Sequence, residues 1–182
     1  MKVRKGLACG SVAVALMVAG VAAAADDTAT VLGKLHHSNQ MEIEMGKLAQ
    51  DKGQSKDVKS FGKTLVTDHT AADKKVVALA KQEKIDLATA MPPMKTDKMA
   101  PLKNAVGAEF DKAFATAMLE DHTKDVDEAK GARSVTTDAK LKALLDSTIP
   151  VLEKHRETAQ KLVVSLGASP APAGAKVMAP AK

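Results

Sequence analysis

The sequence has no tryptophan or tyrosine and only three phenylalanines among its 182 residues. Recognition of bases or sugar rings by stacking on aromatic side chains is therefore excluded as a main mode of binding. The single cysteine, Cys9, lies in an N-terminal apolar segment, so the rest of the chain has no disulfide bond and no thiol chemistry. The sequence also has no glycine-rich phosphate loop and no nucleophile elbow, which argues against the common nucleotide-binding and serine-hydrolase sites.

Residues 1–25 have the pattern of a secretory signal peptide. Three basic residues precede an apolar run over residues 7–21, and three alanines ending at Ala25 precede two aspartates. The run is short for a transmembrane helix, and no later segment is apolar enough for one. We therefore expect a periplasmic protein whose mature chain, 26–182, contains 24 basic and 22 acidic residues. This nearly balanced charge predicts no nucleic-acid partner.

Helix-forming residues dominate the mature chain, and no segment alternates in the manner of a strand. Gly53, Gly131 and Gly167 mark expected helix ends, whereas Ser55 and Thr137 mark expected helix starts. These signals predict four helices, at about 28–52, 56–84, 106–131 and 138–166.

The connection between the second and third predicted helices is about 20 residues long, enough to cross the full length of a bundle. Its prolines, which exclude one continuous helix, are Pro92, Pro93 and Pro101. We therefore predict an all-α fold over 26–167: a ferritin-like four-helix bundle whose second and third helices run parallel, with an up-down bundle as the alternative. Pro150 should kink the fourth helix, and the Ala/Pro-rich segment 168–182 has the composition of a disordered tail.

Each predicted helix carries ionisable side chains in or beside its apolar stripe. The tripeptide Asp-His-Thr occurs twice, at 68–70 and 121–123. At about 100° per residue, the candidates inside the stripes are Glu42 in the first helix, Asp68 in the second, Asp121 in the third and His155 in the fourth. His69 and His122 lie at the edges of the second and third stripes. Ser38 and Thr148 are further polar residues in the stripes of the first and fourth helices. Because an isolated buried carboxylate is costly, the convergence predicts a hydrogen-bonded network, an ion pair or a metal site.

The depth of these residues along the bundle supports one polar belt. Counted from the predicted helix ends, Glu42, Asp68 and Asp121 lie roughly 15–22 Å below the first interhelical turn, while His155 lies roughly 10 Å off that level. Three interpretations follow. The two Asp-His pairs bond to each other across the helices, or the belt binds a divalent transition metal such as iron, zinc, copper or manganese, or these side chains are simply exposed to solvent. The Glu-x-x-His pair that di-iron bundles use twice is missing at both tripeptides, which argues against a di-metal centre.

Two other patterns suggest metals less strongly. His36 and His37 are adjacent, so their side chains point about 100° apart, which favours an exposed pair over a copper or zinc site. Met45 and Met118 fall in apolar stripes, and other methionines are scattered through the long connection. Adaptable packing explains these methionines better than copper binding does.

Several motifs together resemble a known family. They are Asn39 with Glu42-Ile43, Gly46-Lys47-Leu48-Ala49, Phe61-Gly62, Asp68-His69, the block from Phe110 to His122, and Pro150 followed by His155. Over about residues 27–166 the chain resembles the exported bacterial family DUF4142. The resemblance implies a ferritin-like bundle of the periplasm or cell envelope, with no assigned reaction. The positions that match the family pattern include all six candidates of the polar belt.

We therefore predict a non-enzymatic, exported helical bundle with an internal Asp/Glu/His belt, able to bind a divalent metal and serving envelope or stress physiology. The stress role follows from the family resemblance alone. A di-metal ferritin-like oxidoreductase that handles iron or peroxide is the alternative. A third hypothesis is an interaction module whose helical surface or tail docks an envelope protein partner.

Overall fold

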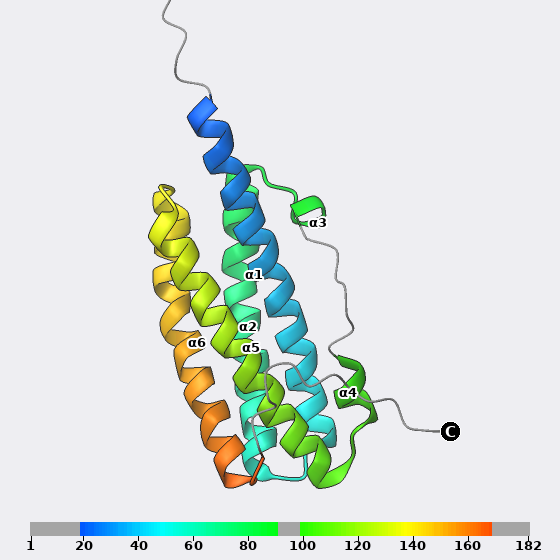
Figure 1. Cartoon of the computed structure of the whole chain (residues 1–182). Helices are drawn as coiled ribbons and strands as arrows, with labels where there is room; N and C mark the ends of the chain where they lie inside the picture. Colours follow the sequence, from blue (N-terminus) through cyan, green and yellow to red (C-terminus); the bar gives the residue numbers. More distant parts are fainter. Residues whose placement is uncertain (1–18, 91–98, 169–182) are drawn as a thin grey trace, which may run out of the picture.

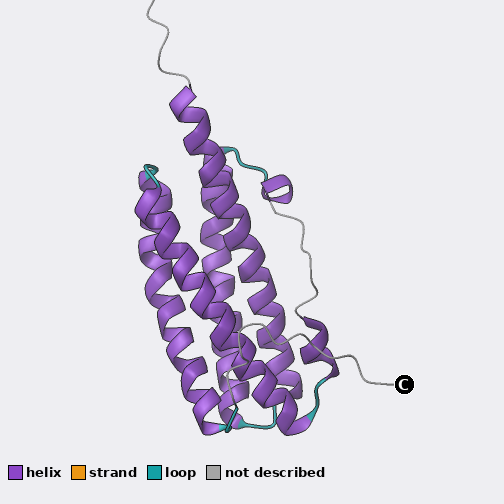
Figure 2. Ribbon diagram, in the orientation of Figure 1, coloured by secondary structure: helices purple, strands orange, loops and turns teal. Residues whose placement is uncertain are grey.

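The computed structural model describes residues 19–90 and 99–168, with side chains from Thr28 onward. All regular secondary structure in this part of the chain is helical (Figure 2). The helices are α1 (Ala19–Lys52), α2 (Lys56–Glu83), α3 (Leu87–Ala90), α4 (Met99–Asn104), α5 (Gly107–Val135) and α6 (Ala139–Ser165). The predicted all-α fold is confirmed, and the four predicted helices correspond to α1, α2, α5 and α6.

The four long helices form two antiparallel hairpins, α1 with α2 and α5 with α6, which pack into one bundle (Figure 1). The short helix α3 lies near the end of the bundle where α2 stops, and α4 lies near the opposite end, where α5 begins (Figure 1). Helices α2 and α5 therefore run in the same direction, as the long connection predicted, and the up-down alternative is wrong. The ferritin-like classification within this all-α fold stays a prediction.

Two of the predicted helix boundaries follow from local chemistry. Ser55 caps α2, because its side chain accepts a hydrogen bond from the backbone N–H of Asp57 at 3.2 Å. Gly167 follows α6 with a φ of 60°, the left-handed conformation in which helices often end.

The buried carboxylate of Asp111 holds the α1–α2 turn against α5. It accepts hydrogen bonds from the backbone N–H groups of Gln54 and Ser55 at 3.0 and 2.7 Å.

The prediction that Gly131 ends the third helix is wrong. Helix α5 continues to Val135, and no atom lies within 4 Å of the position that a Cβ of Gly131 would occupy. A single glycine in a helix costs only about 1 kcal/mol, which the packing of a long helix outweighs. The next helix begins one residue later than predicted from Thr137, because the carboxylate of Asp138 caps its first turn.

Glycine has a packing role where α1 crosses α2. A Cβ at Gly46 would lie 2.7 Å from the carbonyl oxygen of Gly62, and a Cβ at Gly62 would lie 2.7 Å from the carbonyl oxygen of Gly46. Real side chains do not tolerate such a distance to backbone, so the two helices touch here because neither residue has a side chain.

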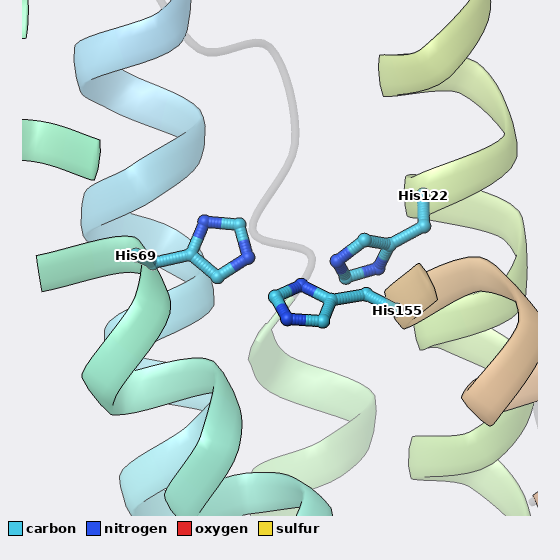
Figure 3. A group of neighbouring side chains, drawn as sticks. All are labelled: His69, His122 and His155. Carbon is cyan, nitrogen blue, oxygen red and sulfur yellow. The ribbon is translucent and has the colours of Figure 1, made fainter. Parts of the chain in front are cut away.

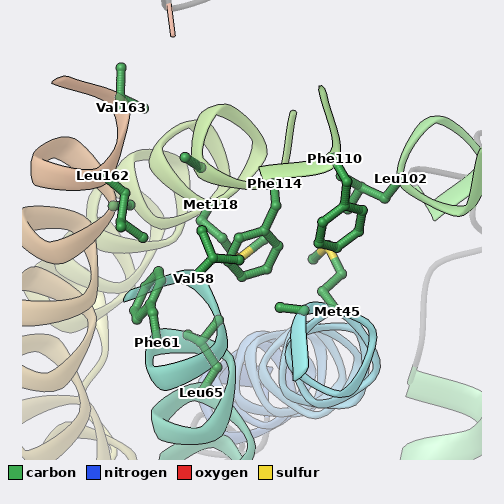
Figure 4. Packing of buried hydrophobic residues seen from close by; sticks show 13 residues of the cluster. Met45, Val58, Phe61, Leu65, Leu102, Phe110, Phe114, Met118, Leu162 and Val163 are labelled. Atoms are coloured by element: carbon green, nitrogen blue, oxygen red, sulfur yellow. The ribbon is translucent and has the colours of Figure 1, made fainter. Parts of the chain in front are cut away.

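The buried apolar side chains form two clusters, one toward each end of the bundle. The first surrounds the three phenylalanines near the α1–α2 turn (Figure 4), where the rings of Phe61 and Phe114 meet edge to face at 6.1 Å. The predicted core methionines, Met45 and Met118, belong to this cluster. The second cluster contains Leu32, Val76, Leu79, Ala80, Val126, Ala129, Leu141, Leu144, Leu145 and Leu152. Between the two clusters lies a layer of buried polar side chains.

Several predictions fall outside the described residues, or are not tested within them. Residues 1–18 of the predicted signal peptide, Pro92 and Pro93, and the tail beyond Ala168 lie outside the described part. Helix α6 passes through Pro150 without interruption, and the kink expected there stays a prediction. Among the described helices, none has the length and apolar character needed to cross a membrane.

Candidate metal centre

Three histidines from three helices meet in the polar layer between the core clusters: His69 of α2, His122 of α5 and His155 of α6 (Figure 3). We call these residues the histidine triad. Their exposed fractions are 3%, 0% and 1%. His69 follows the buried Leu65 by four residues, and His122 follows the buried Met118 by four. The helical repeat that buries the apolar stripe therefore buries the imidazoles as well.

The three rings are arranged around a common point. Figure 3 shows one nitrogen of each ring pointing into the space between the rings, and one ligand atom from each residue lies within 4.8 Å of the other two. Ring centroids are 5.6 Å apart for His69 and His122, and 5.2 Å apart for each of the two pairs with His155. Three atoms that lie within 4.8 Å of one another have a common point no more than about 2.8 Å from each of them. Side-chain rotations that move each nitrogen inward by about 0.7 Å would therefore reach zinc–nitrogen bond lengths.

The outer nitrogen of each imidazole has an oxygen partner. Nδ1 of His69 lies 2.9 Å from Oδ1 of Asn39, and Nδ1 of His122 lies 2.9 Å from the backbone oxygen of Met118. Nε2 of His155 lies 2.9 Å from Oδ2 of Asp68. Each of these oxygens accepts a hydrogen bond from the N–H of the ring, which fixes the tautomer and leaves the inner nitrogen with its lone pair.

The inner nitrogens have no hydrogen-bond partner among the described residues. They are Nε2 of His69, Nε2 of His122 and Nδ1 of His155. A buried polar atom without a partner costs about 1–3 kcal/mol, and here three such atoms face one another. A bound cation would satisfy all three lone pairs at once.

The electrostatics of the triad keep the imidazoles neutral. Burial, followed by repulsion from the two other imidazoles, lowers the pKa of His69 to about 2. Burial and the neighbouring His155 lower the pKa of His122 to about 4. The pKa of His155 is also lowered by burial, although the adjacent Asp68 carboxylate opposes the effect. Neutral imidazole is the form that binds metal, so the triad is ready to act as a ligand set at neutral pH.

None of the three predicted carboxylates belongs to the group of converging ligand atoms. Asp68 is partly exposed and binds the outer face of His155. Glu42 is buried, with Oε1 at 3.8 Å from Nδ1 of His122, on the outer side of that ring. Asp121 lies farther out, in the lining of a surface pocket between α1 and α5.

The reason is geometric. Adjacent residues on a helix point about 100° apart, so an Asp and the following His cannot both face the bundle axis. A neutral imidazole is cheaper to bury than a charged carboxylate, so the histidine turns inward and its neighbouring aspartate outward. The expected direct pairing of one Asp-His with the other is therefore not what the structure shows: the two imidazoles face each other instead.

His155 lies level with the other two histidines, and the predicted offset of roughly 10 Å is wrong. The error came from the helix ends. Because α5 extends to Val135 and α6 begins at Ala139, His122 and His155 lie at similar distances from the turn that joins these helices.

Asn39 was not among the predicted site residues. It is buried, and its side-chain oxygen accepts the hydrogen bond that fixes the tautomer of His69. Asn39 lies three residues before Glu42, on the same face of α1. A polar side chain one turn from a buried carboxylate was the signal that would have found it.

The family model "Domain of unknown function (DUF4142)" matches residues 13–162. The chain belongs to the DUF4142 family. No curated protein and no solved structure matches this DUF4142 chain. The family match spans all three histidines of the triad, together with Asn39 and Asp68.

The two adjacent histidines of the DUF4142 domain, His36 and His37, are separate from the triad. Nδ1 of His36 lies 2.6 Å from Oδ1 of Asp73. The other carboxylate oxygen of Asp73 accepts a hydrogen bond from the side-chain amide N–H of Gln40 at 2.7 Å. His37 lines the surface pocket between α1 and α5. The two rings thus have different surroundings, as expected for adjacent helical residues. The prediction of an exposed pair is wrong, because both residues are half-buried.

Proposed function

We propose that this DUF4142 domain is a metal-binding bundle that holds one divalent transition metal on His69, His122 and His155. The observation that supports the proposal is the pairing pattern of the three rings: each has its outer nitrogen on an oxygen and its inner nitrogen directed at the others. Histidine ligands in metalloproteins have this arrangement, with the second ring nitrogen donating to a carboxylate, an amide or a backbone carbonyl.

The donor set narrows the choice of metal. Three neutral imidazoles suit zinc, copper and iron better than they suit manganese, magnesium or calcium, which prefer oxygen ligands. The carboxylate of Asp68, which is bonded to His155, supplies negative charge beside the triad and so stabilises a dication in a buried site. Three protein ligands leave a further coordination position for water or another small ligand.

A single-metal centre has better support than the di-metal oxidoreductase. A di-metal site requires carboxylates that bridge or complete two adjacent ions, and Glu42, Asp68 and Asp121 all lie outside the converging group. We also propose that the protein works in the periplasm, within envelope physiology. The basic start, short apolar run and alanine-rich processing site of residues 1–25 support export.

The test is metal analysis of the untagged protein. The purified chain would be stripped with a chelator, dialysed against zinc, iron(II) or copper(II), and measured by elemental mass spectrometry. We expect about one metal ion per chain. Cobalt(II) would provide a second readout, because its visible absorption reports nitrogen ligation in a low-coordinate site.

Two matched variants locate the metal. His69→Ala should lose stoichiometric binding and the cobalt spectrum, whereas His37→Ala, which leaves the triad intact, should keep both. If the wild-type protein takes up no metal and its melting temperature ignores all three ions, the triad is a structural polar layer and the proposal is wrong.

A further inference from the structure

A cavity of about 230 Å³ adjoins the histidine triad, between α1, α5 and α6. His69 contributes to its lining, and Leu152 and Asp125 of the lining lie one helical turn from His155 and His122. Most of its surface is aliphatic, from Leu35, Leu145, Leu152 and Ala129, and the polar part includes Ser38 and Thr148. It therefore combines apolar walls with a few polar groups, the usual character of a site for a small molecule.

Ser38 and Thr148 account for part of both the space and its polarity, and the other polar residues of the lining are Lys34, Asn39, His69, Asp125 and Glu128. Ser38 and Thr148 each occupy a position in an apolar stripe where a larger aliphatic side chain would fill the interior. The hydroxyl of Thr148 donates to the backbone oxygen of Leu144 at 2.9 Å, and the hydroxyl of Ser38 donates to Oδ2 of Asp125 at 2.5 Å. Because both protons are already committed, the two hydroxyl oxygens act toward the cavity as acceptors. A ligand that matches them must donate a hydrogen bond.

The volume sets the size of the ligand. An apolar cavity of about 150 Å³ in a protein core is enough to hold benzene, so about 230 Å³ holds a six-membered ring with a substituent. Access is available at the surface, where Lys34 and Glu128 form an exposed ion pair at 3.8 Å beside the opening. A second cavity of about 390 Å³, between α2 and α6, shares the lining residues Thr148 and His69 and offers another approach.

We propose that this cavity binds a small, mostly apolar molecule with one hydroxyl group, of the size of phenol. Its ring lies against Leu35, Leu145 and Leu152, and its hydroxyl donates to Oγ1 of Thr148. Binding places such a molecule beside His69, next to the metal centre proposed above, but the contacts that hold it do not require the metal.

The test measures phenol binding to the full chain, with benzene as the matched probe that lacks the hydroxyl. Titrations followed by carbon–proton NMR of the leucine methyl groups would be run on both zinc-free and zinc-treated protein. We expect saturable shifts at Leu35, Leu145 and Leu152, and affinity for phenol at least threefold higher than for benzene. Thr148→Val, which keeps the shape of the side chain, should remove that preference.

Filling the cavity provides the second arm. Ala132→Phe, from the wall formed by α5, should weaken phenol binding at least tenfold, whereas Ala108→Phe, at an exposed position of the same helix, should not change it. Val31→Phe fills the cavity from α1 and replaces Ala132→Phe if that variant does not fold, as judged by circular dichroism.

The outcomes separate this inference from the metal proposal. Absence of saturable shifts, or unchanged affinity in a folded cavity-filling variant, overturns the cavity as a binding site. Equal affinity for phenol and benzene in the wild type overturns the proposed ligand class. Zinc uptake without phenol binding would overturn this inference alone, and phenol binding without zinc uptake would overturn the metal centre alone.

Discussion

Replacing His122 by leucine should separate the two energetic roles of the triad, because leucine is similar in volume and cannot bind metal. The backbone oxygen of Met118 loses the imidazole but keeps its helical N–H partner, so no new buried polar atom is left without a hydrogen bond. The replacement also removes one of the three inner nitrogens that have no hydrogen-bond partner.

The expected magnitudes have opposite signs with and without metal. Removal of a buried nitrogen without a partner relieves about 1–3 kcal/mol, and loss of the bond to Met118 costs about 1 kcal/mol. The metal-free variant should therefore be between neutral and about 2 kcal/mol more stable than the wild type. With zinc at a hundred times its dissociation constant, the wild type should gain about 2.7 kcal/mol, which corresponds to a rise of about 5–11 °C in melting temperature.

The assay is thermal unfolding by circular dichroism, with chelator and then with a zinc series, for the wild type, His122→Leu and the control His37→Leu. Wild type and control should show the same zinc-dependent rise, and His122→Leu should show none. A metal-free His122→Leu protein destabilised by more than about 3 kcal/mol would refute the reasoning, because the imidazole would then be a favourable member of a closed polar network.

Three further predictions follow from the same contacts. His69 and His122 have lowered pKa values in the folded state, near 2 and 4, so the unfolded chain binds more protons than the folded chain below about pH 6.5. As the pH decreases from 6.5 to 4, the free energy of unfolding, measured by urea titration, should therefore fall by up to about 1.4 kcal/mol per pH unit for each histidine. Asp68→Asn weakens the acceptor that orients the third imidazole, so zinc affinity should fall about 10–100-fold in competition with a chromogenic chelator. Gly131→Ala should stabilise the protein by about 0.5–1 kcal/mol, whereas Gly62→Ala should destabilise it by about 1–3 kcal/mol, and equal effects of the two would contradict the close approach of α1 and α2.

The helical content and the number of long helices could be predicted from the sequence, whereas the long connection favoured parallel second and third helices and left the up-down bundle open. Apolar spacing and the Ser55 cap depend on neighbouring residues alone, and the length of the connection limits the topology. The end of α5 could not be predicted in the same way, because Gly131 has only a weak preference against helix and packing decides the outcome. That four-residue error propagated directly to the depth expected for His155.

The candidate site shows the same division between local and tertiary information. Helical periodicity correctly placed His155 and Glu42 on the inner face of the bundle. It had placed Asp68 inside the stripe and His69 at its edge, whereas the structure buries His69 and leaves Asp68 partly exposed. The difference between burying a neutral ring and burying a charge decides which of two adjacent residues turns inward, and that difference does not appear in a count of apolar positions.

The topology of the bundle determines how the two copies of Asp-His-Thr present their imidazoles to the core. Because α2 and α5 run in the same direction, His69 and His122 approach the common point with the same atom, Nε2, and each has Nδ1 on an oxygen of the bundle. Helix α6 runs the opposite way, and His155 approaches with Nδ1 while Nε2 binds Asp68. An up-down connection would reverse α5, so the second tripeptide would present its imidazole with the opposite tilt along the axis. The long connection through α3 and α4 therefore sets the direction in which the second copy of the tripeptide enters the core, and with it the ring nitrogen that His122 presents to the triad.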